Sequence, residues 1–492
     1  MTSESPTTPS PEKATSPTPV KPSKRRVWLF RLGAVGFGVF LVVMFEVICW
    51  CFDWGQPSHA EDPFVGFREI HPLFELDATG DDYAIPPSRL SFFAPESFPA
   101  KKGKNTYRIF CLGGSTVQGR PWSKETSFTT FLEMALNEAD PSRNWEVINC
   151  GGVSYASYRL VPILQECLNY EPDLFILCTG HNEFLEERTY GHIKHAPPIL
   201  AVPQRWFGGS RTFTLVRQVV RRVTGQSTES LPENRPSLGG ETQPILDYHD
   251  SLQAYHRDPA WRAGVVAHYE SNLARMIAIA QQAEVPIVVV LPPSNLGDSP
   301  PFKSEHREGL SAEEQEKFDR LYAEARERYR SDLSGAIAKL KLAIQVDDQF
   351  AAAWYELGQC YRTRGLATQA REAFIKARDE DICPLRILSP MEESLKRVVK
   401  ETDTPWLDAH ALLEADCRQH ILDGKRLIDH VHPTITGYQK IADALLEQLA
   451  EQGIVHPKAN WQDRVHPLYE KHVQELDDLY FGRATENLEA LR

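Results

Sequence analysis

An aspartate and a histidine lie three positions apart near the end of the sequence, at Asp429 and His432. On one turn of chain, such a carboxylate accepts a hydrogen bond from one imidazole nitrogen and leaves the other nitrogen free to act as a base. A serine hydroxyl is a poor nucleophile until a base of this kind removes its proton. The same two residues also fit a helix-capping aspartate beside a surface histidine, because a helix is predicted at about Gln439–Leu449.

Three further blocks of small and polar residues each follow a short apolar run. They are Gly113-Gly114-Ser115, the stretch from Asn149 to Ser154, and Gly180-His181-Asn182-Glu183. Taken alone, each block is typical of a tight turn, and a serine in such a position commonly caps a helix. If the apolar runs are parallel strands, however, all three blocks lie at the same edge of the sheet, where open α/β folds place their functional groups.

Together with the Asp-x-x-His pair, these blocks resemble the four motifs of the SGNH (GDSL-like) hydrolase family, which carry a serine, a glycine, an asparagine and a histidine in this order. The resemblance extends from about residue 107 to residue 449, with insertions. It implies a flavodoxin-like α/β/α sandwich with a parallel sheet. It also implies a serine hydrolase that cleaves an ester through an acyl-enzyme, without a cofactor or a metal ion.

The resemblance assigns catalytic roles to Ser115 in the first block and to the Asp-x-x-His pair in the last. Ser115 matches the nucleophile, His432 the general base and Asp429 the residue that orients the base. His430 competes for the role of base, but only His432 has both an aspartate three positions before it and a proline after it. A metal site made of the aspartate and both histidines lacks further ligands in a separate cluster, which argues against it. One residue departs from the family pattern, because Gly114 replaces the aspartate before the nucleophile.

The family stabilises the oxyanion with backbone and side-chain N–H groups, and the resemblance points to several donors here. The side-chain amide of Asn182 and the backbone N–H of Ser115 match two of the family's donors. In the second block, Ser154 stands where the family has its glycine, and a serine supplies the same backbone N–H. A local shift of the chain would instead place Gly152 or Gly151 at this position.

The elements that must position these groups are recognisable as apolar runs with strand character. The runs are Tyr107–Leu112, Trp145–Asn149, Leu174–Thr179 and Pro286–Leu291. Amphipathic stretches between them predict helices at about Phe128–Asn137, Tyr158–Asn169 and Val266–Glu284. Nearly continuous apolar strands that alternate with helices predict a parallel sheet with helices on both faces.

The stretch between Asn295 and Asp429 is helical in pattern. It contains the tetratricopeptide spacing of Trp354, Leu357, Gly358 and Tyr361, followed by Ala370, Phe374 and Ala377. Part of this pattern occurs 34 residues earlier, at Ala336, Leu340 and Ala343. The resemblance predicts paired helices over residues 312–383. Because arrays usually need three or more repeats, we expect a helical hairpin that packs on the hydrolase without a binding role, and a surface that binds a protein partner is the alternative.

The N-terminal region differs in composition from the rest of the chain. Of the first 24 residues, 16 are Ser, Thr or Pro, which predicts disorder. The segment Leu32–Phe52 has Glu46 as its only charge and, as a helix of about 32 Å, is long enough to cross a bilayer. A buried globular helix is the alternative. Because basic residues precede this segment, we expect a single-pass protein of the cell membrane with a cytoplasmic N-terminus and a periplasmic catalytic domain.

These patterns divide the chain into six segments. They are a disordered cytoplasmic tail (1–26), a transmembrane helix (27–54), the first part of the hydrolase (55–311), the helical insert (312–383), the C-terminal part of the hydrolase with its Asp-x-x-His pair (384–455) and a helical extension (456–492).

Charge and cysteine content exclude other classes of function. A net charge of −13 would repel a nucleic acid, and nine cysteines without a Cys-x-x-Cys pair argue against a disulfide scaffold or a zinc ribbon. We therefore expect a membrane-anchored hydrolase that acts on an ester, such as an acylated carbohydrate or lipid. The alternatives are an O-acyltransferase that uses the same three residues on an envelope polysaccharide, and a non-catalytic scaffold built on the tetratricopeptide-like helices.

Overall fold

The structure is a computed structural model that describes residues 24–51, 65–67, 71–190, 237–238 and 251–490. The chain divides into two compact units, one made of residues 1–58 and 197–233 and the other of residues 59–196 and 234–492. Helix α1 (Lys24–Cys51) belongs to the first unit. Residues 1–23 of the predicted tail are not among the residues that the structure describes. Among the residues that the structure describes, no helix is long and apolar enough to cross a membrane, so the span predicted over residues 27–54 is not confirmed.

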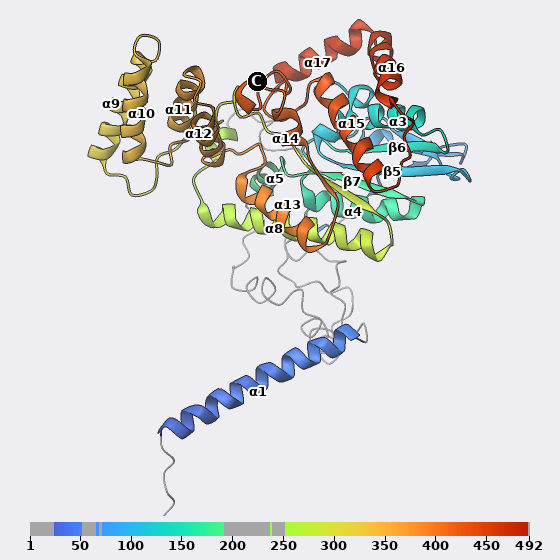
Figure 1. Cartoon of the computed structure of the whole chain (residues 1–492), viewed down its shortest axis with the longest axis horizontal. Coiled ribbons are helices and arrows are strands. Elements are labelled where there is room, and N and C mark those ends of the chain that lie inside the picture. The colour runs from blue at the N-terminus through green and yellow to red at the C-terminus, as the bar shows by residue number, and fades with distance from the viewer. Residues whose placement is uncertain (1–23, 52–64, 68–70, 191–236, 239–250, 491–492) are drawn as a thin grey trace, which may run out of the picture. The chain divides into compact units, whose positions relative to one another are not determined.

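Five parallel strands form the central sheet of the second unit (Figure 1). They are β5 (Thr106–Gly113), β6 (Asn144–Gly151), β7 (Leu174–Cys178), β9 (Ile287–Leu291) and β10 (Trp406–Asp408). The spatial order is β10-β9-β7-β5-β6, so the first of these strands along the chain, β5, lies between the second and the third. This is the flavodoxin-like order. The predicted parallel sheet with helices is therefore confirmed.

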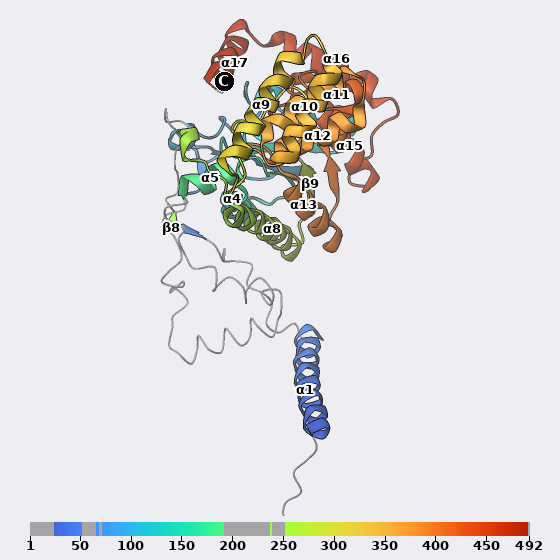
Figure 2. The same ribbon diagram turned by 90° about the vertical axis from the view of Figure 1, so that its left-hand side faces the viewer.

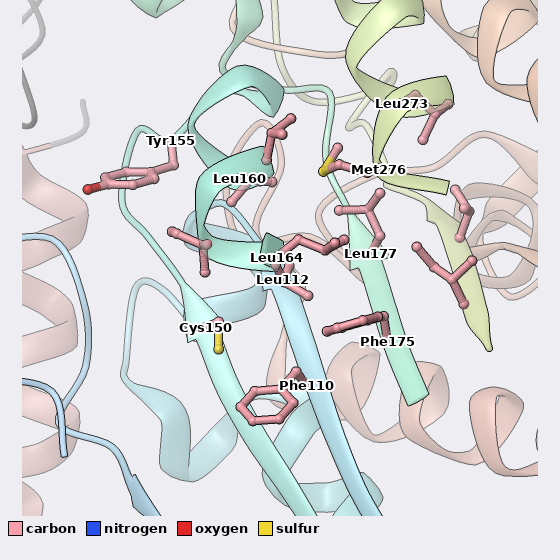
Figure 3. Close-up of a cluster of buried hydrophobic side chains, with 14 of the residues drawn as sticks. Phe110, Leu112, Cys150, Tyr155, Leu160, Leu164, Phe175, Leu177, Leu273 and Met276 are labelled. Carbon is pink, nitrogen blue, oxygen red and sulfur yellow. The ribbon is translucent and has the colours of Figure 1, made fainter. Parts of the chain in front are cut away.

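The strands are apolar on both sides because helices cover both faces of the sheet. In β5, Phe110 and Leu112 belong to the core on one face, whereas Ile109 and Cys111 belong to the core on the other. The first core, part of which is shown in Figure 3, includes side chains of α4 (Ser157–Cys167), α8 (Pro259–Gln282) and α13 (Ser389–Glu401). The second includes side chains of α3 (Phe128–Ala139), α14 (Ala409–Glu414), α15 (Ile435–Glu451) and α16 (Trp461–Glu475), after which α17 (Asp478–Ala490) follows. Burial on both faces explains the unbroken apolar runs.

Two small sheets lie outside the sequence prediction. One is antiparallel and contains β2 (Glu75–Leu76), β3 (Asp82–Ala84) and β4 (Ser97–Pro99), and the other pairs β1 (Gly66–Phe67) with β8 (Ser237–Leu238). The buried guanidinium of Arg108 in β5 attaches the antiparallel sheet to the core. It pairs with Glu146 at 2.8 Å, donates to the carbonyl of Pro99 at 2.8 Å and lies 4.8 Å from the ring centre of Phe98.

Four helices occupy most of the segment predicted as an insert. They are α9 (Ala312–Arg328), α10 (Leu333–Val346), α11 (Ala351–Thr363) and α12 (Ala367–Asp379), and Figure 2 shows them side by side. Gly358 of α11 lies against Phe374 of α12, where a Cβ would come within 2.7 Å of the ring. The hydroxyl of Tyr322 in α9 donates to Glu356 in α11 at 2.7 Å and so joins the two helix pairs. The relation of these helices to tetratricopeptide repeats stays a prediction.

The last residue of β5, Gly113, should not tolerate a side chain. A Cβ there would lie 2.2 Å from the carbonyl oxygen of Cys178 and 2.3 Å from Cγ2 of Val117. Because strand backbone cannot move away easily, Gly113→Ala should lower the free energy of unfolding by about 1–3 kcal/mol, the usual cost of overpacking. Urea denaturation measures this change. Gly264→Ala in α8 is the control, because its Cβ would meet nothing within 4 Å and should not lower the stability. Equal stability of both variants would contradict the close approach at Gly113.

Candidate active site

Ser115 lies where strand β5 ends and the short helix α2 (Ser115–Gln118) begins. Gly113, two residues before Ser115, pairs with Gly151 of β6 on one side and with Cys178 of β7 on the other. The segments that follow these three strands therefore emerge beside Ser115. This is the carboxyl edge of the sheet, where open α/β folds bind their ligands.

Ser115, His432 and Asp429 form a continuous chain of hydrogen bonds. The hydroxyl oxygen of Ser115 is 2.7 Å from Nε2 of His432, and Nδ1 of His432 is 2.6 Å from Oδ2 of Asp429. An ionised carboxylate only accepts hydrogen bonds, so Nδ1 carries the proton and donates it to Asp429. Nε2 is then an acceptor and receives the hydrogen bond from the serine hydroxyl. The structure thus brings together the three residues that the sequence assigned to one site, with His432 in the tautomer that a base requires.

Asp429 is held in place by the backbone of its own segment. Its second oxygen, Oδ1, accepts hydrogen bonds from the backbone N–H groups of Val431 and His432, both at 2.8 Å. Burial would raise the pKa of the Asp429 carboxyl, but the charge that His432 carries when it is protonated and the hydrogen bonds from His432 hold this pKa well below its ordinary value. The carboxylate is therefore ionised throughout the ordinary working range of pH.

Two other histidines lie near this chain of hydrogen bonds, and burial keeps both of them neutral. His430 packs against the ring of Phe302, and burial lowers its pKa to about 4, although the charge of Asp429 acts in the opposite direction. Nδ1 of His181 accepts a hydrogen bond from the backbone N–H of Ile387 at 3.1 Å, and burial lowers the pKa of His181 well below its ordinary value. In the described part of the chain, no group of three or more histidine, cysteine or acidic side chains is arranged to hold a metal ion.

The second block offers fewer oxyanion donors than its two glycines suggest. The N–H of Gly151 donates to the side chain of Asn149 at 2.9 Å, and the N–H of Gly152 donates to the carbonyl of Gly113 at 3.0 Å. Both N–H groups are therefore already used within the fold. The structure does not present Gly152, one of the predicted donors, to a substrate.

Ser154 is the residue of this block whose backbone suits the role. Its N–H makes no hydrogen bond with any residue that the structure describes. Its φ angle is +63°, in the left-handed region that glycine favours. A serine adopts this conformation at a cost of about 1–2 kcal/mol. The backbone at Ser154 is therefore one that glycine adopts more readily than serine.

Asn182 and Ser115 carry the other two predicted donors. The side-chain amide of Asn182 donates one hydrogen to the carbonyl of Tyr155 at 3.1 Å, and its second hydrogen is left for another acceptor. Ser115 is the first residue of α2, so its N–H has no acceptor within that helix. A Cβ on Gly114 would lie 2.5 Å from Nδ2 of Asn182. The absence of a side chain at Gly114 therefore makes room for this amide.

Two polar residues to which the sequence analysis gave no role hold these loops together. Nδ2 of Asn149 donates to the carbonyl of Val117 at 2.7 Å and so ties the end of β6 to α2. The buried carboxylate of Glu183, at the start of α5 (Glu183–Tyr190), accepts hydrogen bonds from the N–H and the hydroxyl of Ser157, both at 2.8 Å. The partners of Asn149 and Glu183 lie on other segments of the chain, so the sequence alone does not reveal these contacts. The only sequence feature that points to a role for the two residues is their position inside the motif blocks.

The backbone at Ser154 determines which substitutions the site should tolerate. Ser154→Gly should keep the rate at which Ser115 reacts with a fluorophosphonate probe within about twofold, because glycine adopts this φ freely and supplies the same N–H. Ser154→Val should lower the rate at least about tenfold, because a β-branched residue is strained there and displaces the N–H. Mass spectrometry of the labelled protein over time gives both rates. A Ser154→Val protein that reacts like the wild type would show that this N–H is not a donor.

Comparison of the chain with known proteins finds similarity among solved structures alone. No protein-family model matches the sequence, and no curated protein matches it. The chain is similar to an acetyl-xylooligosaccharide esterase from Geobacillus stearmophilus, with 11% identity and a TM-score of 0.31 over 70% of this chain and 96% of that one. It is also similar to a lipase/acylhydrolase from Enterococcus faecalis, with 11% identity and a TM-score of 0.31 over 72% of this chain and 98% of that one. A third similar structure is an alpha/beta hydrolase from the metagenome of Lake Arreo, Spain, with 12% identity and a TM-score of 0.30 over 71% of this chain and 96% of that one.

Proposed function

We propose that this protein is a serine hydrolase of the SGNH type that cleaves an ester bond through an acyl-enzyme. The observation that carries the proposal is the unbroken chain of hydrogen bonds from Asp429 through His432 to Ser115, with lengths of 2.6 and 2.7 Å. Ser115 and His432 are 317 residues apart in the sequence, so their contact is not a result of proximity along the chain. A serine that merely begins a helix needs neither an imidazole nor a carboxylate behind it.

In the proposed first step, Oγ of Ser115 attacks the carbonyl carbon of the ester while Nε2 of His432 takes the hydroxyl proton. Asp429 remains ionised and stabilises the imidazolium that forms. His432 then gives the proton to the leaving alcohol as the C–O bond breaks, and the acyl group stays on Ser115. In the second step a water molecule attacks this acyl group, with His432 again as base, and releases the acid and the free serine.

The negative charge that develops on the carbonyl oxygen would be met by three N–H donors. They are the backbone N–H groups of Ser115 and Ser154 and the side-chain amide of Asn182, from the segments that follow β5, β6 and β7. The loss of one such donor typically costs about 3 kcal/mol of transition-state stabilisation. Donors that the fold holds in place need no reorganisation during the reaction, which supports a catalytic use of this edge of the sheet.

The proposed substrate is an ester, such as an acylated carbohydrate or lipid, and the proposed acceptor of the acyl group is water. The membrane anchor and the periplasmic location of the catalytic domain remain predictions from residues 1–54, and the idea that the ester belongs to the cell envelope depends on them. A protein partner for the helical insert likewise remains a prediction.

The proposal is tested first by Ser115→Ala in the full chain. This variant should lower kcat for p-nitrophenyl esters of short acids by at least about 1,000-fold, because it removes the nucleophile. The overall fold should not change, because the hydroxyl is a small group at a turn. Release of p-nitrophenol measures the activity, and circular dichroism checks the fold.

The outcomes of this test separate the alternative functions. Hydrolysis by Ser115→Ala near the wild-type rate would identify another nucleophile. A wild-type protein that neither hydrolyses esters nor reacts with a fluorophosphonate would favour the non-catalytic scaffold. Transfer of an acetyl group to an added oligosaccharide instead of water would make the protein an O-acyltransferase that uses the same three residues.

The pH dependence of kcat/KM should rise between about pH 5 and 8 and should follow a single ionisation. The base must be neutral to accept the serine proton, and an ordinary imidazole titrates at about pH 6.5. Burial lowers the pKa of His430 to about 4 and the pKa of His181 well below its ordinary value, so neither adds a second ionisation in this range. Initial rates across this range give the profile. His430→Gln should leave its midpoint unchanged, and a slope of two or a flat profile would rule out a single histidine base.

A further inference from the structure

One face of helix α11 in the insert contacts the catalytic part of the chain. Tyr355, Gln359 and Arg362, which we call the α11 anchor, are spaced four and three positions apart, so their side chains leave the helix on the same side. All three donate to the carbonyl oxygen of Gly297 in the loop after β9. The distances are 3.1 Å from the hydroxyl of Tyr355, 2.6 Å from Nε2 of Gln359 and 3.2 Å from Nη1 of Arg362. Three donors, one of them charged, therefore fix a single carbonyl group.

Arg362 also joins two carboxylates from different loops. Its Nη1 is 2.7 Å from Oδ1 of Asp298, and its Nη2 is 2.7 Å from Oδ2 of Asp423. Burial alone would lower the pKa of Arg362, but Asp298 and Asp423 raise this pKa above its ordinary value. The second oxygen of Asp298 accepts a hydrogen bond from the N–H of Gly424 at 2.9 Å. The guanidinium therefore ties the loop after β9 to the segment that leads into the Asp-x-x-His pair.

The loop after β9 is bonded directly to the backbone beside the catalytic aspartate. Nδ2 of Asn295 donates to the carbonyl of Asp429, and the N–H of Asn295 donates to the carbonyl of His430, both at 2.9 Å. Only Leu296 separates Asn295 from the anchored Gly297. A displacement of Gly297 would therefore reach the backbone of Asp429 through one pair of hydrogen bonds.

Apolar packing holds the same loop. Leu296 is 1% exposed and packs with Ala370 and Phe374 of α12 and with Ile421. Ala370 and Phe374 belong to the tetratricopeptide-like pattern. Each residue of the α11 anchor directly follows a residue of that pattern, in the pairs Trp354-Tyr355, Gly358-Gln359 and Tyr361-Arg362. The pattern residues thus build the helix pair, and the residues after them contact the catalytic part of the chain.

We propose that the α11 anchor positions the Asp429–His432 pair, and that the insert is in this way a structural part of the active site. By fixing Gly297, the anchor fixes Asn295 and the backbone of Asp429, and so sets the alignment of the imidazole with the serine. The residues of the anchor are positioning residues, because they reach the reacting atoms only through others. The inference rests on the proposed function, since it concerns the pair that activates the serine.

The test is Arg362→Gln in the full chain, which removes the charge and keeps a long polar side chain. A displacement of about 1 Å in a catalytic group can cost about 100-fold in rate, so we expect the reaction of Ser115 with a fluorophosphonate to slow at least about tenfold. For p-nitrophenyl acetate, kcat should fall by a similar factor while KM stays within about twofold. Arg364→Gln, at the end of the same helix, is the matched control and should change neither, because Arg364 bonds the exposed hydroxyl of Ser334 instead.

A double variant separates positioning from a general loss of structure. In an Asp429→Asn background the carboxylate no longer aligns the imidazole, so Arg362→Gln should lower the remaining rate by less than about twofold. Losses that multiply would overturn the proposal, and so would an Arg362→Gln protein that reacts within about twofold of the wild type. If the melting temperature shows that Arg362→Gln does not fold, Gln359→Leu removes the 2.6 Å contact alone and is judged by the same two outcomes.

Failure of this inference is distinguishable from failure of the proposed function. A wild-type protein that the fluorophosphonate does not label would remove the serine hydrolase proposal and this inference with it. A labelled wild type whose rate does not depend on the α11 anchor would overturn the positioning role alone.

Discussion

The rest of the structure must hold Ser115 and His432 within hydrogen-bond distance of each other. The two are 317 residues apart, one after β5 and the other between β10 and α15. They meet because both segments lie at the carboxyl edge of one parallel sheet. A contact of 2.7 Å tolerates little displacement, and the dense apolar cores on both faces of the sheet hold the strand ends in register.

Polar contacts hold the loops at the carboxyl edge of the sheet in place, because these loops have no strand partners of their own. Asn149 ties β6 to the turn that carries the serine, Glu183 ties the third block to the start of α4, and Asn295 holds the backbone of Asp429. Each of these side chains forms a hydrogen bond with the backbone of another segment. The loops are therefore rich in polar residues for a structural reason.

The sequence predicts those parts of the fold whose elements leave a regular pattern. The four long strands do so, whereas β10 has three half-buried residues and the antiparallel strands have two or three residues each. The pair Asp429 and His432 is predictable because its members are close in sequence, and Ser115 because it follows a strand. The proposed oxyanion donors are harder to predict. Whether Gly152 has a free N–H depends on strand pairing, and whether Ser154 can replace a glycine depends on its φ, and both are properties of the folded backbone.

The close approach of Gly114 to the side chain of Asn182 has a consequence for how this sequence can change. A Cβ at position 114 would lie 2.5 Å from Nδ2 of Asn182, so any other residue there forces the amide to turn or the loop to move. The effect of a substitution at either position therefore depends on the residue at the other, which makes the two positions epistatic. An aspartate or any other side chain at position 114 would therefore be accommodated only after the third block had already rearranged.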